Sequence, residues 1–328
     1  MRRFLACALA AASAVQLRPV PRRAVGAAAA AAAAAASLPL LALPRVASAA
    51  PAVNTDANYL AKSARRVEER HVADVAADGT VTYETVTRLT GEATGFDLTK
   101  REDISERIFG AAVRADWPAS PPWNPRDFKR IDESDDAGFY APDKPRFAYH
   151  VDEGAVAALA NYYKGELKPG GDVLDLCSSW VSHYPEAAKL GRVAGVGMNA
   201  RELDANGRLT ERVVRDLNTN PTLPFADNSF DAVTLVVSVD YLTKPVEVLK
   251  EARRVLRRGG KIIISQSNRL FMTKAVAMWL GMGDEAHLEL IGQYLYYAGF
   301  DVPAKAFDIT AKGRGARDPM YVVKATAP

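Results

Sequence analysis

The sequence predicts an α/β protein whose main domain is a doubly wound, mostly parallel seven-stranded sheet with an antiparallel terminal strand. The chain has 328 residues, of which 48% are hydrophobic, enough for a large core. From residue 129 onward, short apolar runs alternate with amphipathic helical patterns, as they do in parallel sheets with helical crossovers. The last two strand patterns, near 304–310 and 319–325, have no helical pattern between them, which predicts an antiparallel pair.

The elements of this main domain follow one another in a regular order. Asp152 is placed to cap a first helix, which ends near Gly165. Buried strands are predicted at 172–176, 192–197, 230–239 and 261–265. The helix between the last two has a proline, Pro245, in its first turn and two glycines, Gly259 and Gly260, at its end. A further helix is predicted over 284–298, closed by Gly299.

Residues 51–128 are predicted to form a small N-terminal accessory domain, for which the sequence indicates no role. Apolar residues recur at helical spacing over 56–67, and 80–86 alternates as a strand does. A capping box predicts a second helix over 99–114. The tryptophans and prolines of 117–125 break any helix and mark the boundary with the main domain at 129–328.

The charge balance and the few cysteines make nucleic-acid binding, a disulfide framework and a metal site unexpected. Lys and Arg total 42 and Asp and Glu total 39, a net charge of +3. Six arginines precede the first acidic residue, Asp56, so without the first 49 residues the balance is 36 minus 39, or −3. The body therefore lacks the basic concentration of a nucleic-acid-binding protein. Cys7 and Cys177 are the only cysteines, and the histidines are scattered, so we predict neither a disulfide framework nor a metal site.

Residues 1–50 are predicted to be a cleavable leader in two layers. Arg2 and Arg3 precede a short apolar stretch, and Arg22 and Arg23 precede an alanine-rich one that ends in an A-x-A cleavage site at 47–49. The second layer resembles a twin-arginine signal. The whole resembles the multipartite leaders of thylakoid-lumen proteins in algae whose plastids lie inside the endomembrane system, which implies a chloroplast transit peptide and a lumenal protein. A signal anchor at 24–43 and bacterial export are the alternatives, and the mature chain is expected to carry no membrane span.

Five strings of sequence carry a resemblance to a known family. They are VLDL at 173–176, DLN at 216–218, LPFADNSFDAV at 223–233, VSVDYL at 237–242 and VLKEARRVLRRGGKIIIS at 248–265. Their order resembles class I S-adenosylmethionine-dependent methyltransferases, nearest to the type 11 group. The string DLCSSWVSHYP at 175–185 resembles a methyltransferase-like subfamily with a divergent first motif. The resemblance implies a Rossmann-like fold, S-adenosylmethionine as cofactor and methyl transfer to a small-molecule acceptor beneath a cap from residues 129–150.

The family pattern also implies which residues bind the methyl donor. Asp175 matches the acidic residue of the first motif, and Asp216 matches the residue that contacts adenine, with the Leu217 N–H beside it. The candidate cofactor-binding residues are Asp175, Cys177, Ser178, Ser179, Asn199, Asp216, Leu217 and Ser238.

Two elements of the family pattern are altered in this chain. Cys177, Ser179 and Val181 stand where the family has the three glycines of G-x-G-x-G. Larger side chains there either close the pocket or impose another loop path. Gly197 stands where the family has the acidic residue that binds ribose, so Asn199 or Glu202 is the candidate substitute.

The candidate catalytic residues are His183, Tyr184 and Tyr241, which follow the ends of two predicted strands. His183 and Tyr184 can accept or relay a proton from an acceptor hydroxyl, and the alternative for His183 is a histidine at a helix start. For Tyr241, the alternative is a buried tyrosine with a satisfied hydroxyl. Asn268 and Arg269 are candidates for holding an anionic substrate, or Arg269 forms a surface ion pair.

Two hypotheses about function follow. The first is methyl transfer from S-adenosylmethionine to a small molecule. The second is a non-catalytic module that keeps the methyltransferase fold for binding or assembly, because the glycines and the ribose acid are missing.

Overall fold

The computed structural model describes residues 64–75, 80–93, 96–110, 117–185, 187–301 and 303–328. The predicted leader and most of the helix predicted over 56–67 lie outside the described residues.

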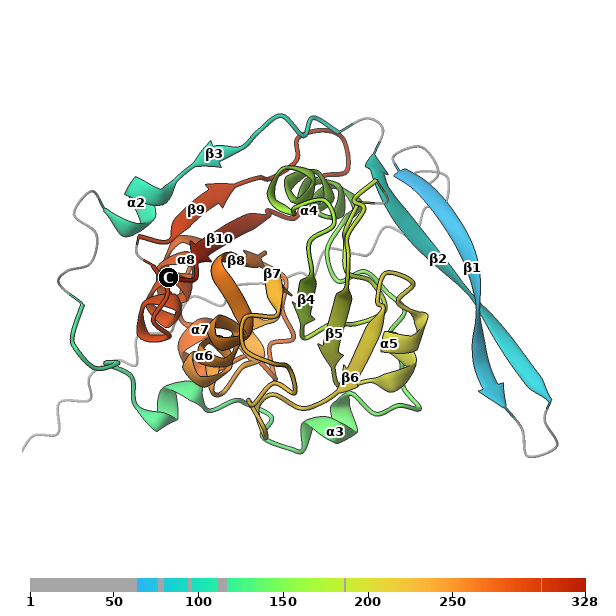
Figure 1. Cartoon of the computed structure of the whole chain (residues 1–328), viewed down its shortest axis with the longest axis horizontal. Helices are drawn as coiled ribbons and strands as arrows, with labels where there is room; N and C mark the ends of the chain where they lie inside the picture. The colour runs from blue at the N-terminus through green and yellow to red at the C-terminus, as the bar shows by residue number, and fades with distance from the viewer. Residues whose placement is uncertain (1–63, 76–79, 94–95, 111–116, 186, 302) are drawn as a thin grey trace, which may run out of the picture. The chain divides into compact units, whose positions relative to one another are not determined.

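An eight-stranded sheet forms the centre of the described chain (Figure 1), in the order β3-β9-β10-β8-β7-β4-β5-β6. Its strands are β3 (Glu102–Asp103), β4 (Val173–Leu176), β5 (Val193–Gly197), β6 (Glu211–Val214), β7 (Phe230–Val236), β8 (Leu256–Gln266), β9 (Lys305–Asp308) and β10 (Tyr321–Thr326). The five strands from β8 to β6 are parallel, whereas β10 runs antiparallel to both β8 and β9. The predicted fold class is therefore confirmed, and β3 is a strand more than the seven predicted.

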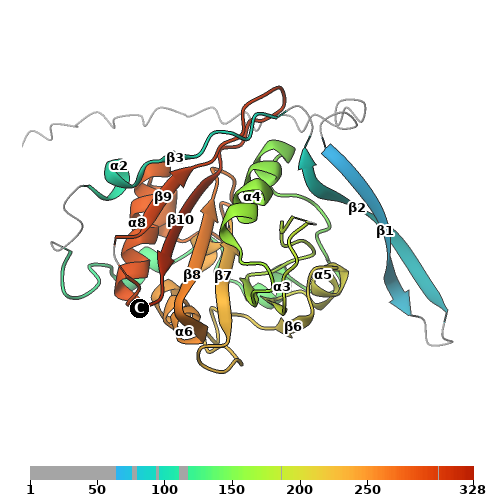
Figure 2. The same ribbon diagram turned by 45° about the horizontal axis from the view of Figure 1, so that its top comes forward.

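Helices cover both faces of the sheet, as a doubly wound fold requires. They are α2 (Ser105–Phe109), α3 (Asp136–Phe139), α4 (Glu153–Glu166), α5 (Ala200–Ala205), α6 (Pro245–Val255), α7 (Ala277–Leu280) and α8 (Asp284–Tyr297), with 3₁₀ turns η1 (Pro125–Phe128) and η2 (Val239–Tyr241). Ile262 and Ile264 of β8 pack in one core with α6 and α8, whereas Ile263 packs in the other with α4. Successive strand residues point to opposite faces, so α4 and α8 lie on opposite sides of the sheet (Figure 2).

Two helices of the main domain begin and end close to the predicted positions. Asp152 caps α4 by accepting a hydrogen bond from the Ala155 N–H, and α8 is followed by Gly299 in the left-handed region. α6 ends earlier than the two glycines suggest, because the chain already pairs as β8 from Leu256 onward. α4 and α8, at 14 residues each, are the longest helices of the described chain. No helix within these residues combines the length and hydrophobicity that a membrane crossing needs.

The segment before residue 129 differs from its prediction. Residues 64–67, predicted to be helical, belong to strand β1 (Ala64–Val75), which pairs antiparallel with β2 (Val81–Ala93) in a separate two-stranded sheet. Long-range pairing overrides the local helical spacing here. The helix predicted over 99–114 begins only at Ser105, since residues 102–103 add β3 to the edge of the main sheet. Ile108 and Phe109 of α2 are buried in the core that contains α8.

Candidate functional site

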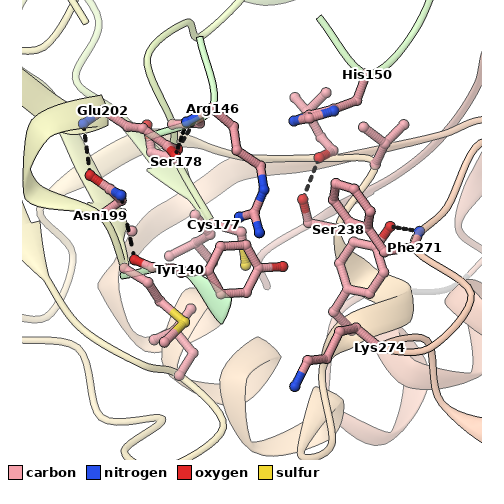
Figure 3. Close-up of a pocket in the computed structure, with 18 of the residues that line it drawn as sticks. Tyr140, Arg146, His150, Cys177, Ser178, Asn199, Glu202, Ser238, Phe271 and Lys274 are labelled. Carbon is pink, nitrogen blue, oxygen red and sulfur yellow. Dashed lines mark hydrogen bonds between the residues drawn. The ribbon is translucent and has the colours of Figure 1, made fainter. Parts of the chain in front are cut away.

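A cavity of about 420 Å³ lies at the carboxyl ends of the parallel strands (Figure 3). This volume lies within the usual range of small-molecule and cofactor sites, roughly 300–1,000 Å³. Open α/β sheets bind ligands at this edge. The lining comes from the ends of β4, β5, β6 and β7, from the segment 269–274 after β8, and from residues of 130–151 that lie over the strand ends as the predicted cap does.

The structure brings nearly all the predicted site residues to this cavity. Residues that line it and that the sequence singled out are Asp175, Cys177, Ser178, Ser179, Asn199, Asp216, Leu217 and Ser238, together with His183 and Tyr241. Tyr184 does not line the cavity. Its side chain is buried in the core, 5.4 Å from the ring of Tyr163, and its hydroxyl shares a 2.6 Å hydrogen bond with Thr234. The structure therefore places Tyr184 away from the cavity in which the other candidates lie.

The chain between β4 and β5 is a loop, with no helix among its described residues. Asp175 organises it, accepting hydrogen bonds from the hydroxyls of Ser178 at 2.8 Å, Ser182 at 2.7 Å and Thr234 at 3.1 Å. Burial raises the pKa of Asp175 to about 6. Ser178 and Ser182 thus turn their hydroxyls to a buried carboxylate, and these hydrogen bonds hold the divergent first loop together.

Close packing explains the glycine at the position of the ribose acid. A Cβ atom on Gly197 would lie 2.1 Å from the carbonyl oxygen of Ser178, a distance that no side chain tolerates. The loop after β4 therefore crosses directly over the end of β5. Glycine is required at 197 by this crossing, and an acidic side chain has no room there.

Three non-glycine residues that line the cavity have positive φ: Cys177 at 53°, His183 at 55° and Val237 at 39°. This left-handed region is costly for side chains with a Cβ, above all for β-branched ones. Cys177, which stands at the first glycine of the family motif, keeps the backbone conformation that glycine normally supplies. Burial raises the pKa of its thiol to about 12, so the thiol stays protonated at neutral pH.

The two predicted substitutes for the ribose acid are already engaged. Asn199 caps α5 by accepting a hydrogen bond from the Glu202 N–H, and its amide donates to the Ala141 carbonyl at 2.8 Å. Glu202 is buried and accepts from the Arg146 N–H at 2.8 Å and from the Ser179 hydroxyl at 2.7 Å. These contacts attach the cap and the first loop to α5.

Asp216 lines the cavity just after the end of β6. Its Oδ1 accepts from the Asn218 N–H at 2.8 Å, and its Oδ2 accepts from the Thr219 hydroxyl. Each carboxylate oxygen has two lone pairs, so both can still accept a hydrogen bond from a ligand. The buried side chain of Leu217 lies beside Asp216 in the cavity wall.

The remaining catalytic candidates differ in protonation. Burial lowers the pKa of His183 to about 4, so its imidazole is neutral at physiological pH, and its buried Nδ1 has no hydrogen-bond partner. The Tyr241 hydroxyl accepts from the Phe271 N–H at 2.8 Å, and burial raises its pKa, so Tyr241 remains a hydrogen-bond donor. Ser238 donates to the Val236 carbonyl at 2.6 Å.

Several cavity residues were not identified individually from the sequence. Tyr140, Arg146 and His150 come from the cap, and Phe271 and Lys274 come from the chain after β8. Lys274, with a side chain only 1% exposed, pairs with Asp132 at 3.0 Å and Asp136 at 3.1 Å. The strings FKRIDESDDAGFY and PRFAYHVDE, which contain the cap residues, were the signal that could have found them.

Comparison with known proteins agrees with this geometry. Residues 174–264, from β4 to β8, match a family model described as a methyltransferase domain, of the type 11 group. This segment is a class I methyltransferase domain. The chain is also similar to demethylmenaquinone methyltransferases. Over 113 residues it is 32% identical to the one from Bacillus cereus and 31% identical to the one from Bacillus anthracis. The match covers 32% of the chain and 48% of each relative, so the chain spans about half the length of these curated relatives.

Solved methyltransferase structures are also similar to the chain. One is a possible histamine N-methyltransferase from Thermotoga maritima, with a TM-score of 0.41 and 20% identity, which covers 53% of this chain and 90% of that one. Another is an S-adenosylmethionine-dependent methyltransferase from Aquifex aeolicus, with a TM-score of 0.37 and 16% identity, which covers 63% and 100%.

S-adenosylmethionine is the cofactor of this methyltransferase domain, and the cavity residues fit it in part. The cavity has the size and position of a cofactor site, and Asp216 retains free acceptor capacity at the place where the family binds adenine. At the ribose position the Ser178 carbonyl covers Gly197, so the family's carboxylate contact is absent. If the donor binds here, other groups of the cavity hold its ribose.

Proposed function

We propose that this protein transfers the methyl group of S-adenosylmethionine to a small-molecule acceptor. The observation that carries the proposal is the cavity of about 420 Å³ at the carboxyl ends of the parallel strands, walled by the methyltransferase segment and roofed by residues of 130–151. The curated relatives are named for methylating demethylmenaquinone. The chain matches only 48% of their length, so their acceptor is not carried over to this chain.

In this proposal, Asp216 and Leu217 hold the adenine end of the donor, and the loop of Cys177, Ser178 and Ser179 holds its methionine end. The donor supplies a methyl group activated by a positively charged sulfonium. Because the methyl group is already activated, most of the rate enhancement comes from aligning the acceptor and excluding water. The cap residues and the segment after β8 serve this purpose by covering the strand ends.

The chain's own residues orient the acceptor. His183, neutral and with an unpartnered Nδ1, can accept a hydrogen bond from an acceptor hydroxyl, and Tyr241 can donate one. In the transfer the acceptor's nucleophilic atom gains a bond to the methyl carbon, the sulfur–methyl bond breaks, and S-adenosylhomocysteine is released. A proton carried by the acceptor atom passes to solvent. With a pKa of about 4, His183 is a weak base and acts by positioning.

Titration calorimetry of the full chain with S-adenosylmethionine and S-adenosylhomocysteine tests the proposal. A ligand present at 100 times its dissociation constant stabilises the folded state by about 2.7 kcal/mol, so the melting temperature should rise. Absence of both a binding isotherm and a melting shift at saturating ligand would contradict it.

A second function, a non-catalytic binding module, is favoured by the crossing of Ser178 over Gly197 and by the engagement of Asn199 and Glu202. Under this alternative the fold is retained without the donor. A crystal structure grown with S-adenosylhomocysteine separates the two: the ligand above β4 and β5 supports the enzyme, and an empty cavity supports the module.

The cellular location is a separate proposal. The twin arginine at 22–23 and the A-x-A site at 47–49 support export of the folded protein into the thylakoid lumen. A fluorescent fusion of residues 1–50, with Arg22 and Arg23 changed to Lys as the control, tests it.

A further inference from the structure

Arg146 places a guanidinium in the cavity without a carboxylate partner. Its Nη2 donates to the Phe139 carbonyl at 2.6 Å, while its Nη1 is buried and has no hydrogen-bond partner. No ion pair among the described residues includes Arg146. Figure 3 shows its side chain extending from the cap into the cavity, toward Tyr140 and Cys177. A buried charged donor that lacks an acceptor is costly, so the cavity calls for an anionic or strongly accepting ligand group.

Three of the other cations that line the cavity have carboxylate partners, and the fourth, Arg215, is exposed enough to donate to the Thr222 carbonyl at the surface. Arg130 pairs with Asp136 at 2.7 Å, and Lys274 pairs with the same carboxylate at 3.1 Å. Arg269, 44% exposed, has Asp318 at 3.7 Å. Arg146 differs from these three because the groups around it are carbonyls and rings. The pKa of His150 is lowered by burial and by the positive charges of Arg146 and Arg269, which is consistent with a positive potential in this part of the cavity.

Aromatic rings surround the same guanidinium. Its central carbon lies 4.2 Å from the ring centre of Phe139, 5.2 Å from that of Tyr140 and 5.7 Å from that of Phe271. The Phe271 ring in turn lies 5.8 Å from Tyr241 and 5.2 Å from His150. Tyr140, Tyr241, His150 and Phe271 all line the cavity, so a planar ligand has flat apolar surfaces on which to pack.

We infer that the acceptor is an aromatic carboxylate whose ring packs among Tyr140, Tyr241 and Phe271 and whose carboxylate binds Arg146. The guanidinium fork matches a carboxylate geometrically, and its buried Nη1 is the donor that such a group would satisfy. This inference rests on the proposed methyl transfer and adds the class of substrate.

The test measures binding of three probes to the full chain saturated with S-adenosylhomocysteine. 2-Hydroxybenzoate has both the ring and the charge, 2-hydroxybenzamide lacks the charge, and cyclohexanecarboxylate lacks the aromatic ring. We expect 2-hydroxybenzoate to bind at least tenfold more tightly than either.

Arg146→Gln should remove the preference over the amide, and Arg146→Lys should retain part of it. Arg269→Gln, in which the altered cation already has a carboxylate partner, should keep the preference within about threefold. The melting temperature of each variant verifies that it folds.

Three results would overturn the inference: equal binding of 2-hydroxybenzoate and its amide, loss of the preference in Arg269→Gln but not in Arg146→Gln, or competition between 2-hydroxybenzoate and S-adenosylhomocysteine. Competition would assign Arg146 to the carboxylate of the donor and leave the proposed function intact. Conversely, if S-adenosylhomocysteine does not bind while 2-hydroxybenzoate binds through Arg146, methyl transfer fails and the aromatic-anion site remains.

Discussion

The carbonyl oxygen of Ser178 lies directly against Gly197. A Cβ atom at position 197 would lie 2.1 Å from this oxygen, so no residue larger than glycine fits there. Residue 178 belongs to the divergent first motif and residue 197 ends the neighbouring strand, so the two departures from the family pattern are one structural adjustment. The loop occupies the space that the ribose acid would otherwise fill.

Restoring the family's acidic residue should damage the protein. Gly197→Asp and Gly197→Ala place atoms against backbone, and we expect each to lower the free energy of unfolding by about 3 kcal/mol or more, or to prevent folding. Gly207 is an exposed glycine, and a Cβ added to it would meet no atom within 4 Å, so Gly207→Ala should change stability by no more than about 0.5 kcal/mol. Denaturant unfolding measures both. A stable Gly197→Asp variant with tighter donor binding would contradict the loop path.

The first motif should accept glycine at 177 but no β-branched residue. Cys177 has a φ of 53°, which glycine adopts freely and valine adopts at a cost of about 1–3 kcal/mol. We therefore expect Cys177→Gly to stay within about 1 kcal/mol of the wild-type stability, since relief of strain offsets the lost side chain. Cys177→Val should be clearly less stable in the same thermal melts. Equal stability of the two variants would show that the backbone here is not left-handed in solution.

Loss of the Asp216 carboxylate should weaken donor binding. We expect Asp216→Ala to raise the dissociation constant of S-adenosylhomocysteine at least tenfold, about 1.4 kcal/mol, as for other hydrogen bonds to charged groups. Asp204, on α5 with a side chain 75% exposed, lies outside the cavity lining, so Asp204→Ala is the matched control and should bind normally. Calorimetry on both variants gives the comparison. An unchanged affinity in Asp216→Ala would reject the adenine assignment.

Asp240 should make stability depend on pH. Its side chain is 1% exposed, and burial raises its pKa to about 8. Between the unfolded pKa of about 3.9 and the folded value, the unfolded chain has lost this proton and the folded chain has kept it. Stability therefore falls as pH rises through this window, by up to about 1.4 kcal/mol per pH unit from this group, and levels off above pH 8.

The variant Asp240→Asn cannot ionise, so its stability should lack this contribution and exceed that of the wild type above pH 8. Unfolding curves between pH 5 and pH 9 for both proteins provide the measurement. Parallel profiles would mean that Asp240 is ionised or solvated in the folded protein.

Much of the fold could be predicted because its signals are local and repeated. The start of α4 at Asp152 and the end of α8 at Gly299 were predicted from caps, and the buried strands from unbroken apolar runs. The failures lie where distant segments pair. Residues 64–67 have helical spacing, yet β1 pairs with β2, and residues 102–103 join the edge of the main sheet beside β9. Local spacing contains no information about these partners.

For the site, sequence patterns were enough to predict which residues gather at the strand ends, because residues that follow parallel strands meet at one edge of the sheet. How each residue is used depends on the packing of the whole fold. That packing buries Tyr184 in the core, directs Ser178 and Ser182 to Asp175, and leaves Arg146 among rings without a counter-charge. The reason is physical: a side chain's position along the chain follows from local pattern, but its hydrogen-bond partners and its charge environment come from segments far away in sequence.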